Sequence, residues 1–194
     1  MKRLSLFLLL FVMVFGLSAQ EVKKTALLLI DIQDYYFPSG SVELVGSEKA
    51  AIVASKVLKG FRERNQMVIH VKHRAKSGGE INKLVRPLPD EIIFEKTEVN
   101  AFINTELKST LDTNGITHIV IVGMQTHMCL EAAARAATDF KYKVTVVEDA
   151  CATRDLSYGD VLVPAKYVHY STLATLKSYC TVIKFEVFNK KLSF

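Results

Sequence analysis

The residues whose types and positions could together do chemistry are Cys129, Asp31 and Lys96. A thiol becomes a nucleophile when it loses its proton, a carboxylate can take that proton, and an ammonium group stabilises the resulting negative charge. Each residue follows a short apolar segment of the kind that forms a buried strand. Taken singly, each also has an ordinary structural explanation: a small buried side chain, a turn acid and a solvated cation. Their joint occurrence after three separate strands predicts a nucleophilic catalytic site.

Cys129 is the predicted nucleophile because of its position relative to a helix. Residues 123–129 (Gly-Met-Gln-Thr-His-Met-Cys) join an apolar segment to an alanine-rich segment that is predicted to be helical over residues 129–140. The unpaired amides and the dipole at a helix N-terminus favour a thiolate, and the same amides could receive an oxyanion. The sequence therefore predicts a reactive sulfur at the start of this helix.

The elements that must hold these residues alternate between short apolar runs and longer amphipathic segments. This alternation predicts a parallel sheet with helices on both faces, a three-layer α/β/α arrangement of the Rossmann-like type. The predicted strands cover residues 25–30, 67–71, 91–94, 118–122, 143–147 and 181–188, and the predicted helices cover residues 48–63, 101–110, 129–140 and 164–179. In such sheets ligands bind beyond the carboxyl ends of the strands, where Asp31, His73 and Cys129 are expected.

Length and composition point to a single globular domain. The chain has 194 residues, 49% of them hydrophobic, which predicts one domain over residues 20–194 with a core that needs no disulfide. The formal net charge is only +5, and the basic residues are scattered among acids, which argues against a nucleic-acid partner. The residue spacings typical of dinucleotide binding, phosphate-binding loops and zinc fingers are absent.

Residues 1–19 have the pattern of a signal peptide. Lys2 and Arg3 precede an almost wholly apolar run over residues 4–16, and Leu-Ser-Ala at residues 17–19 is a suitable cleavage site. The alternative is an uncleaved membrane anchor, but the run is shorter than the ~20 residues that span a bilayer. We therefore expect a periplasmic or secreted protein without a stable membrane anchor. Its net charge would be +3, because Lys2 and Arg3 would leave the +5 total.

The chain has three cysteines, an odd number for an exported protein. At least one of them must stay free or pair between chains. Cys151 and Cys180 could form a bridge or could both be free, because the sequence does not test the geometry of a disulfide.

Three ordered blocks resemble the signatures of the isochorismatase-like cysteine hydrolases, within the nicotinamidase and isochorismatase superfamily. They are residues 31–37 (Asp-Ile-Gln-Asp-Tyr-Tyr-Phe), residues 95–102 (Glu-Lys-Thr-Glu-Val-Asn-Ala-Phe) and residues 123–129, and residues 149–155 resemble a fourth family segment. The resemblance covers residues 25–187. It implies a six-stranded parallel sheet, a triad of Asp31, Lys96 and Cys129, and assembly as a homodimer or homotetramer. It also implies a cis peptide bond between Met124 and Gln125, from which we infer an oxyanion hole made by the backbone amides of Gln125 and Cys129.

The departures from the family pattern narrow the expected chemistry. In the nicotinamidase branch a metal is bound by an Asp and two His, with an Asp-x-His pair near the second strand. Residues 71–74 read Val-Lys-His-Arg here, so His73 stands alone and we predict neither a metal nor another cofactor. True isochorismatases have no Cys at the nucleophile position. Cys129 therefore favours hydrolysis of the C–N bond of a small amide, through a thioester.

Several residues near the triad are expected to line the substrate pocket: Gln33, Phe37, His73, Asn100, Phe102 and His127. His169, on the last predicted helix, is expected to be a packing residue. Two other functions stay open, a redox-active thiol at Cys129 and a binding protein that kept the fold without turnover. The sequence does not choose among nicotinamide-like, ureido, carbamoyl and lactam substrates.

Overall fold

The structure, a computed structural model, describes residues 24–192. The predicted signal peptide at residues 1–19 lies outside the described residues.

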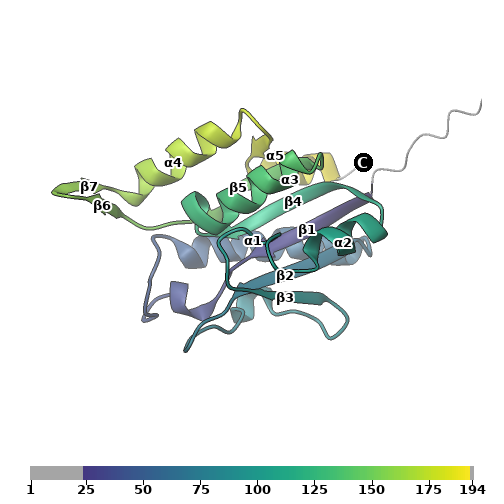
Figure 1. Ribbon diagram of the computed structural model, residues 1–194, viewed down its shortest axis with the longest axis horizontal. Helices are drawn as coiled ribbons and strands as arrows, with labels where there is room; N and C mark the ends of the chain where they lie inside the picture. The colour runs from purple at the N-terminus through teal and green to yellow at the C-terminus, as the bar shows by residue number, and fades with distance from the viewer. Residues whose placement is uncertain (1–23, 193–194) are drawn as a thin grey trace, which may run out of the picture.

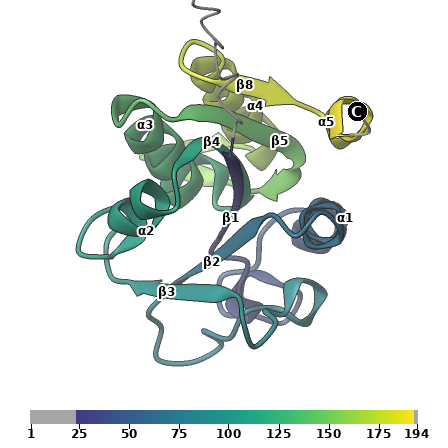
Figure 2. The ribbon, with the colours of Figure 1, turned by 90° about the vertical axis from the view of Figure 1, so that its right-hand side faces the viewer.

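Six strands form one parallel sheet in the order β3-β2-β1-β4-β5-β8 (Figure 1; β8 is labelled in Figure 2). Their bounds are β1 Lys24–Ile30, β2 Met67–His73, β3 Ile92–Lys96, β4 Ile116–Met124, β5 Lys143–Ala152 and β8 Thr181–Ile183. The chain builds outward from β1 to β3, returns to the other side of β1, and builds outward again from β4 to β8. The strand order therefore reverses between β1 and β4, which is where ligands of such sheets bind. The predicted six-stranded parallel α/β fold is confirmed.

Helices cover both faces of the sheet, so the central strands are buried on two sides, whereas Ile93 and Glu95 of the edge strand β3 are exposed (Figure 2). One face carries α1 (Ser47–Glu63) and α5 (Phe185–Leu192), and the other carries α2 (Leu107–Thr113), α3 (Glu131–Asp139) and α4 (Ala165–Leu176). Alternate side chains of β1 pack into the two cores, which explains its unbroken apolar sequence. Among the described helices none is both long and apolar enough to cross a bilayer.

The predicted helix over residues 101–110 is wrong in its first half, because α2 begins only at Leu107. Side chains there satisfy the backbone in turns instead. Asn100 Oδ1 accepts a hydrogen bond from the Phe102 amide at 3.0 Å, and Thr105 Oγ1 donates to the Ala101 carbonyl at 2.6 Å. Such local bonds compete with a helix and favour its start downstream.

The predicted last strand, residues 181–188, is wrong beyond Ile183. There α5 begins at Phe185, whose amide donates to Asp149 Oδ1 at 2.7 Å and is thereby capped. The sequence also gave no sign of the β6–β7 hairpin, Leu156–Tyr158 paired with Val161–Val163. Three-residue strands are too short to show periodicity.

All three cysteines are free, so the bridge between Cys151 and Cys180 is not formed.

Gly123 is required where β4 passes β1 beside the site. It pairs with Ile30 at a φ of 130°, and a Cβ added there would lie 2.0 Å from the Ile30 carbonyl oxygen. We expect Gly123→Ala to lower the free energy of unfolding by more than about 4 kcal/mol, or to prevent folding. The reason is that the Ile30 backbone is held in β1 and cannot shift without disturbing the sheet. Gly159→Ala is the matched control, since Gly159 also has positive φ but no neighbour within 4 Å. Gly159→Ala should lower the free energy of unfolding, measured with urea, by about 1–2 kcal/mol. Equal losses in the two variants would contradict the close-approach explanation.

Candidate active site

The three predicted catalytic residues meet at the carboxyl edge of the sheet. Asp31 directly follows β1, Lys96 is the last residue of β3, and Cys129 lies in the turn after β4. Lys96 Nζ is 2.8 Å from Asp31 Oδ2 and 3.3 Å from Cys129 Sγ. The exposed fractions are 0% for Asp31, 2% for Lys96 and 5% for Cys129. The structure thus brings together, away from water, three side chains that are far apart in the sequence.

Local backbone geometry orients Asp31 and Cys129 just beyond the ends of β1 and β4. Asp31 has a φ of 47°, a left-handed conformation that Asp adopts more readily than most residues, and its amide still donates to the Val71 carbonyl at 2.9 Å. Cys129 lies in a π-helical turn, Thr126–Leu130, that runs into α3 at Glu131. The peptide bond between Met124 and Gln125 is cis, the geometry that the resemblance implied.

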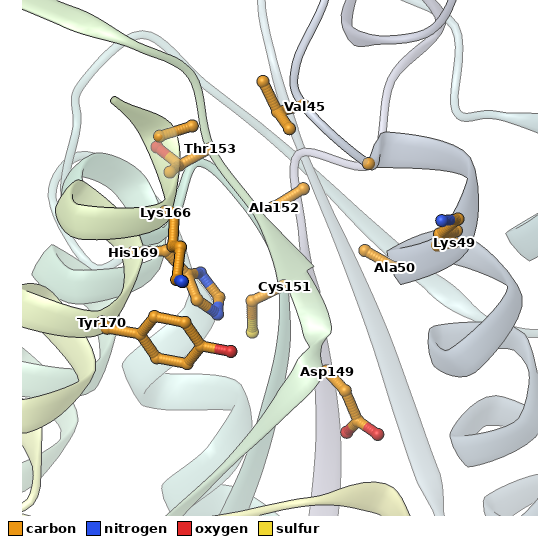
Figure 3. A pocket seen from close by; sticks show the side chains of 12 residues that line it. Val45, Lys49, Ala50, Asp149, Cys151, Ala152, Thr153, Lys166, His169 and Tyr170 are labelled. Carbon is orange, nitrogen blue, oxygen red and sulfur yellow. The ribbon is translucent and has the colours of Figure 1, made fainter. Parts of the chain in front are cut away.

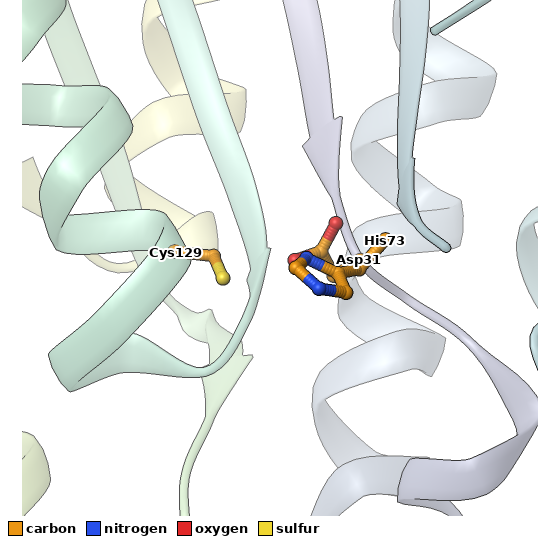
Figure 4. A group of neighbouring side chains, drawn as sticks. All are labelled: Asp31, His73 and Cys129. Carbon is orange, nitrogen blue, oxygen red and sulfur yellow. The ribbon is translucent and has the colours of Figure 1, made fainter. Parts of the chain in front are cut away.

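The third hydrogen of the Lys96 ammonium goes to His73, at the end of β2. Lys96 Nζ lies 3.1 Å from His73 Nδ1, so Asp31, Cys129 and His73 give one acceptor to each of its three N–H bonds. Because an ammonium group can only donate, His73 must accept on Nδ1. Its neutral ring therefore carries its proton on Nε2. Burial, and then the charge of Lys96, lower the pKa of His73 and favour that neutral form. Figure 4 shows Cys129 facing Asp31 and His73 across the gap between strand ends.

Asp31, His73 and Cys129 have the donor types of a metal site, and their ligand atoms lie within 4.8 Å of one another. However, Lys96 Nζ is within 3.3 Å of all three groups and so occupies the position that an ion would take. Two cations at one centre would repel each other strongly. The residues therefore do not fit a metal centre, and the expectation of a metal-free site stays a prediction.

Burial shapes the charge states of the acid and the thiol. It raises the pKa of Asp31 above its usual range, although the charge and hydrogen bond of Lys96 oppose this rise. Burial, together with the charge of Asp31, raises the pKa of the Cys129 thiol to about 12, which outweighs the opposing effect of Lys96. The resting sulfur is therefore a thiol, and the carboxyl group beside it has a raised pKa. The thiolate expected from helix-terminus arguments alone is wrong for the resting state.

Gln33 holds β2 in place. Its Oε1 accepts from the His73 amide at 2.7 Å, and its Nε2 donates to the carbonyls of His73 and Gly79 at 2.9 and 2.7 Å. Tyr35 donates its hydroxyl to the same Oε1 at 3.1 Å. With no exposed surface and its amide used in this way, Gln33 positions the backbone of His73.

The other predicted pocket residues have partners within the protein. Phe37 and Phe102 are buried in the two cores, where Phe102 packs against Phe140 and Tyr142. Asn100 closes its own turn, and His127 Nδ1 is 2.6 Å from Thr153 Oγ1. Their contact with a substrate stays a prediction.

Sequence reasoning did not identify Tyr36, Thr126 and His169 as side chains that support the site. Gln125 Nε2 donates to the Tyr36 hydroxyl at 3.3 Å, and Thr126 Oγ1 lies 2.9 Å from His169 Nδ1. Tyr36 could have been noticed because it lies in the same block as Asp31. Nothing in the sequence linked His169 to Thr126, because 43 residues separate them. Two buried oxygens near these contacts, Asp31 Oδ1 and Gln125 Oε1, have no hydrogen-bond partner among the described residues.

Comparison with known proteins agrees with this geometry. The Isochorismatase domain model matches residues 25–163, which is most of the chain. The chain belongs to the isochorismatase family. The uncharacterized isochorismatase family protein YddQ of Bacillus subtilis (strain 168) is 43% identical over 178 residues, covering 86% of this chain and 99% of YddQ. The crystal structure of an isochorismatase from Pseudomonas putida KT2440 superposes with a TM-score of 0.80 at 31% identity, covering 84% of this chain and 89% of that one.

Relatives with a named activity include amidohydrolases. The ureidoacrylate amidohydrolase RutB of Variovorax paradoxus (strain S110) is 31% identical over 129 residues, 66% of this chain and 50% of RutB. The N-carbamoylsarcosine amidase of Thermoplasma acidophilum has the same fold, with a TM-score of 0.70 at 24% identity over 84% of this chain and 96% of that one. The chain is therefore an isochorismatase-family hydrolase with amidohydrolase relatives.

The geometry predicts that removing the charge of Asp31 makes the sulfur of Cys129 more reactive toward an added electrophile. Asp31→Asn removes the charge that helps raise the pKa of Cys129 and leaves the ammonium of Lys96 beside the sulfur. We expect iodoacetamide to alkylate Cys129 about tenfold faster at pH 8 in this variant, one pKa unit being a tenfold change in thiolate. Peptide mass spectrometry gives the rate, with Cys151 and Cys180 as internal references. A slower reaction would show that Asp31 does not repel the thiolate.

Proposed function

We propose that the chain is a metal-free cysteine amidohydrolase that cleaves a C–N bond of a small molecule through a thioester. The observation that carries this proposal is the buried contact of Lys96 Nζ with both Asp31 Oδ2 and Cys129 Sγ. A buried acid, ammonium and thiol in mutual contact form a nucleophile with its base already in place.

The first half-reaction replaces the C–N bond of the substrate with an S–C bond and moves the thiol proton to the departing nitrogen. Asp31 Oδ1, which has no other partner among the described residues, takes the proton of the Cys129 thiol. The sulfur attacks the substrate carbonyl, and the electrons of the C=O bond move onto oxygen. The backbone amides of Gln125 and Cys129 receive this oxyanion, and one such donor is worth about 3 kcal/mol in other enzymes. The C–N bond then breaks, and Asp31 gives its proton to the departing nitrogen.

The second half-reaction regenerates the thiol. Asp31 takes a proton from water, the hydroxide attacks the thioester carbonyl, and the S–C bond breaks. The proton then returns from Asp31 to the sulfur, while the product leaves as an acid. The raised pKa of Asp31 suits this repeated exchange, because it makes the carboxylate a stronger base than an exposed one. Throughout, Lys96 stabilises whichever of the two groups is anionic.

The rival functions find less support. Redox-active cysteines have low pKa values, whereas burial and Asp31 raise the pKa of Cys129 to about 12. A protein that only binds ligands would not need a buried ammonium shared between an acid and a thiol.

Replacement of the nucleophile tests the proposal directly. We expect Cys129→Ser to lower ammonia release from a panel of nicotinamide-like, ureido, carbamoyl and lactam compounds by about a thousandfold or more, because the hydroxyl is a far weaker nucleophile. Circular dichroism should show an unchanged fold. In the native protein, acid quenching and mass spectrometry should find an acyl group on Cys129. A variant that keeps its activity, or a native protein that forms only mixed disulfides, would refute the hydrolase.

A pair of variants at His73 tests this residue as a positioning residue for Lys96. In His73→Asn the amide oxygen can take the place of Nδ1, whereas in His73→Gln it lies near the place of Nε2. We expect Asn to keep kcat/KM within about fivefold and Gln to lower it about 10- to 100-fold, the range of a hydrogen bond to a charged group. Both variants should stay folded.

The acid limb of the pH profile separates positioning from packing. Activity should fall as the pH is lowered, because Asp31, whose pKa is raised by burial, and His73, whose pKa is lowered by burial, both become protonated. The plot of log kcat/KM against pH should therefore steepen toward a slope near two in the native enzyme. In His73→Asn only Asp31 remains, so the slope should stay near one. An unchanged slope would exclude His73 from the active charge state.

A further inference from the structure

A cavity of about 280 Å³ is lined by the start of α1, the end of β5 and the first half of α4 (Figure 3). Its polar lining includes Lys49, Cys151, Thr153, Lys166, His169 and Tyr170. None of Asp31, Lys96 and Cys129 lines it. In Figure 3 the His169 ring, the Tyr170 hydroxyl and the end of Lys166 gather around the Cys151 side chain. A concave site with a few converging polar groups is the usual form of a small-ligand site.

The charges around this cavity favour an anion. Lys49 and Lys166 bring two ammonium groups, against one carboxylate, Asp149, whose Oδ1 is used in capping Phe185 at 2.7 Å. The lining also includes Gly46, where the 17-residue helix α1 begins without a side-chain cap. The positive end of that helix adds to the two lysines.

His169 connects the cavity to the catalytic turn, and its proton can be placed. Thr126 Oγ1 is 3.2 Å from the Ala152 carbonyl and 2.9 Å from His169 Nδ1. A carbonyl only accepts, so the single hydroxyl proton goes to Ala152, and His169 Nδ1 must donate to Thr126. In the neutral ring, which burial favours by lowering the pKa of His169, Nε2 is then without a proton. An anion in the cavity would favour protonation of Nε2, which makes the ring a donor on both sides.

We propose that this cavity binds a small oxyanion, and that its occupancy acts through His169 and Thr126 on the turn that carries Cys129. Thr126 has no exposed surface, directly follows Gln125, and belongs to the same π-helical turn as Cys129. A change in the Thr126 contact therefore reaches both amides of the proposed oxyanion hole. Binding does not depend on the proposed function, whereas an effect on turnover rests on it.

Calorimetric titration of the purified protein tests the site. Sodium sulfate represents phosphate-type anions, because it does not titrate where histidine does, and sodium malonate represents carboxylates. We expect millimolar binding of at least one, and the tighter of the two identifies the ligand class. Lys166→Met should weaken it about tenfold or more. Lys177→Met, at the other end of α4, is the matched control and should bind as the native protein does. No binding up to about 20 mM, or equal binding by Lys166→Met, would overturn the proposal.

The pH dependence of sulfate binding tests His169. Native binding should be about fivefold tighter at pH 6 than at pH 8, because the imidazolium adds a donor and a charge. His169→Asn keeps an amide near the place of Nδ1 for Thr126 but lacks Nε2, so its binding should be nearly independent of pH. The same pH dependence in that variant would exclude His169 from the site.

The link to the catalytic turn is measured by alkylation of Cys129, which does not require that the protein be a hydrolase. A saturating concentration of the bound anion should change the iodoacetamide rate at Cys129 about threefold or more in the native protein, and not in Lys166→Met. Binding without such a change would overturn the link. A change in alkylation in a protein that releases no ammonia from any amide would support the link while refuting the proposed function.

Discussion

The ammonium of Lys96 is a full charge held out of water, and its three acceptors are the only compensation it has among the described side chains. Removing one partner of a buried ion pair typically costs about 3–5 kcal/mol, because the remaining charge stays unpaired. Those acceptors follow β1, end β2 and lie in the turn after β4, while Lys96 itself ends β3. A slip of one residue in β1, β2 or β3 would point the wrong side chain into the site. The charge therefore ties function to the register of the sheet.

Burial and the neighbouring carboxylate, rather than Lys96, set the protonation state of the sulfur. A helix start alone would favour a thiolate, but the desolvation of Cys129 and the neighbouring carboxylate work against it and outweigh Lys96. In the proposed mechanism the thiol rests protonated beside Asp31, and it is activated when the substrate carbonyl lies against the amides that would hold its oxyanion. It is also less open to oxidation than an exposed thiolate. This difference matters for a protein whose sequence predicts an oxidising compartment.

The features that could be predicted from the sequence are those carried by long apolar segments or by distinctive blocks of residues. Continuous apolar strands and the ordered blocks around Asp31, Lys96 and Cys129 are long or distinctive, and the residues meet as expected. The hairpin β6–β7 and helix α5 were missed because short segments lack periodicity and because Asp149, 36 residues away, caps α5. Gln33 was expected at the substrate, yet its amide pairs with the backbone of His73. Such roles depend on which strands are neighbours, which sequence patterns do not show.

The catalytic turn is supported from behind by other elements rather than by its own helix. Thr126 and His127 both bond to residues at the end of β5 or just beyond it, Ala152 and Thr153, and α4 adds His169. Since Ala152, Thr153 and His169 also line the cavity of about 280 Å³, the residues that hold the turn are the same ones that border the cavity. A buried polar contact such as that of Thr126 and His169 has a definite donor and acceptor, so a change of protonation must alter it rather than merely weaken it. The proposed coupling between the cavity and Cys129 therefore depends on the proton shared by His169 and Thr126.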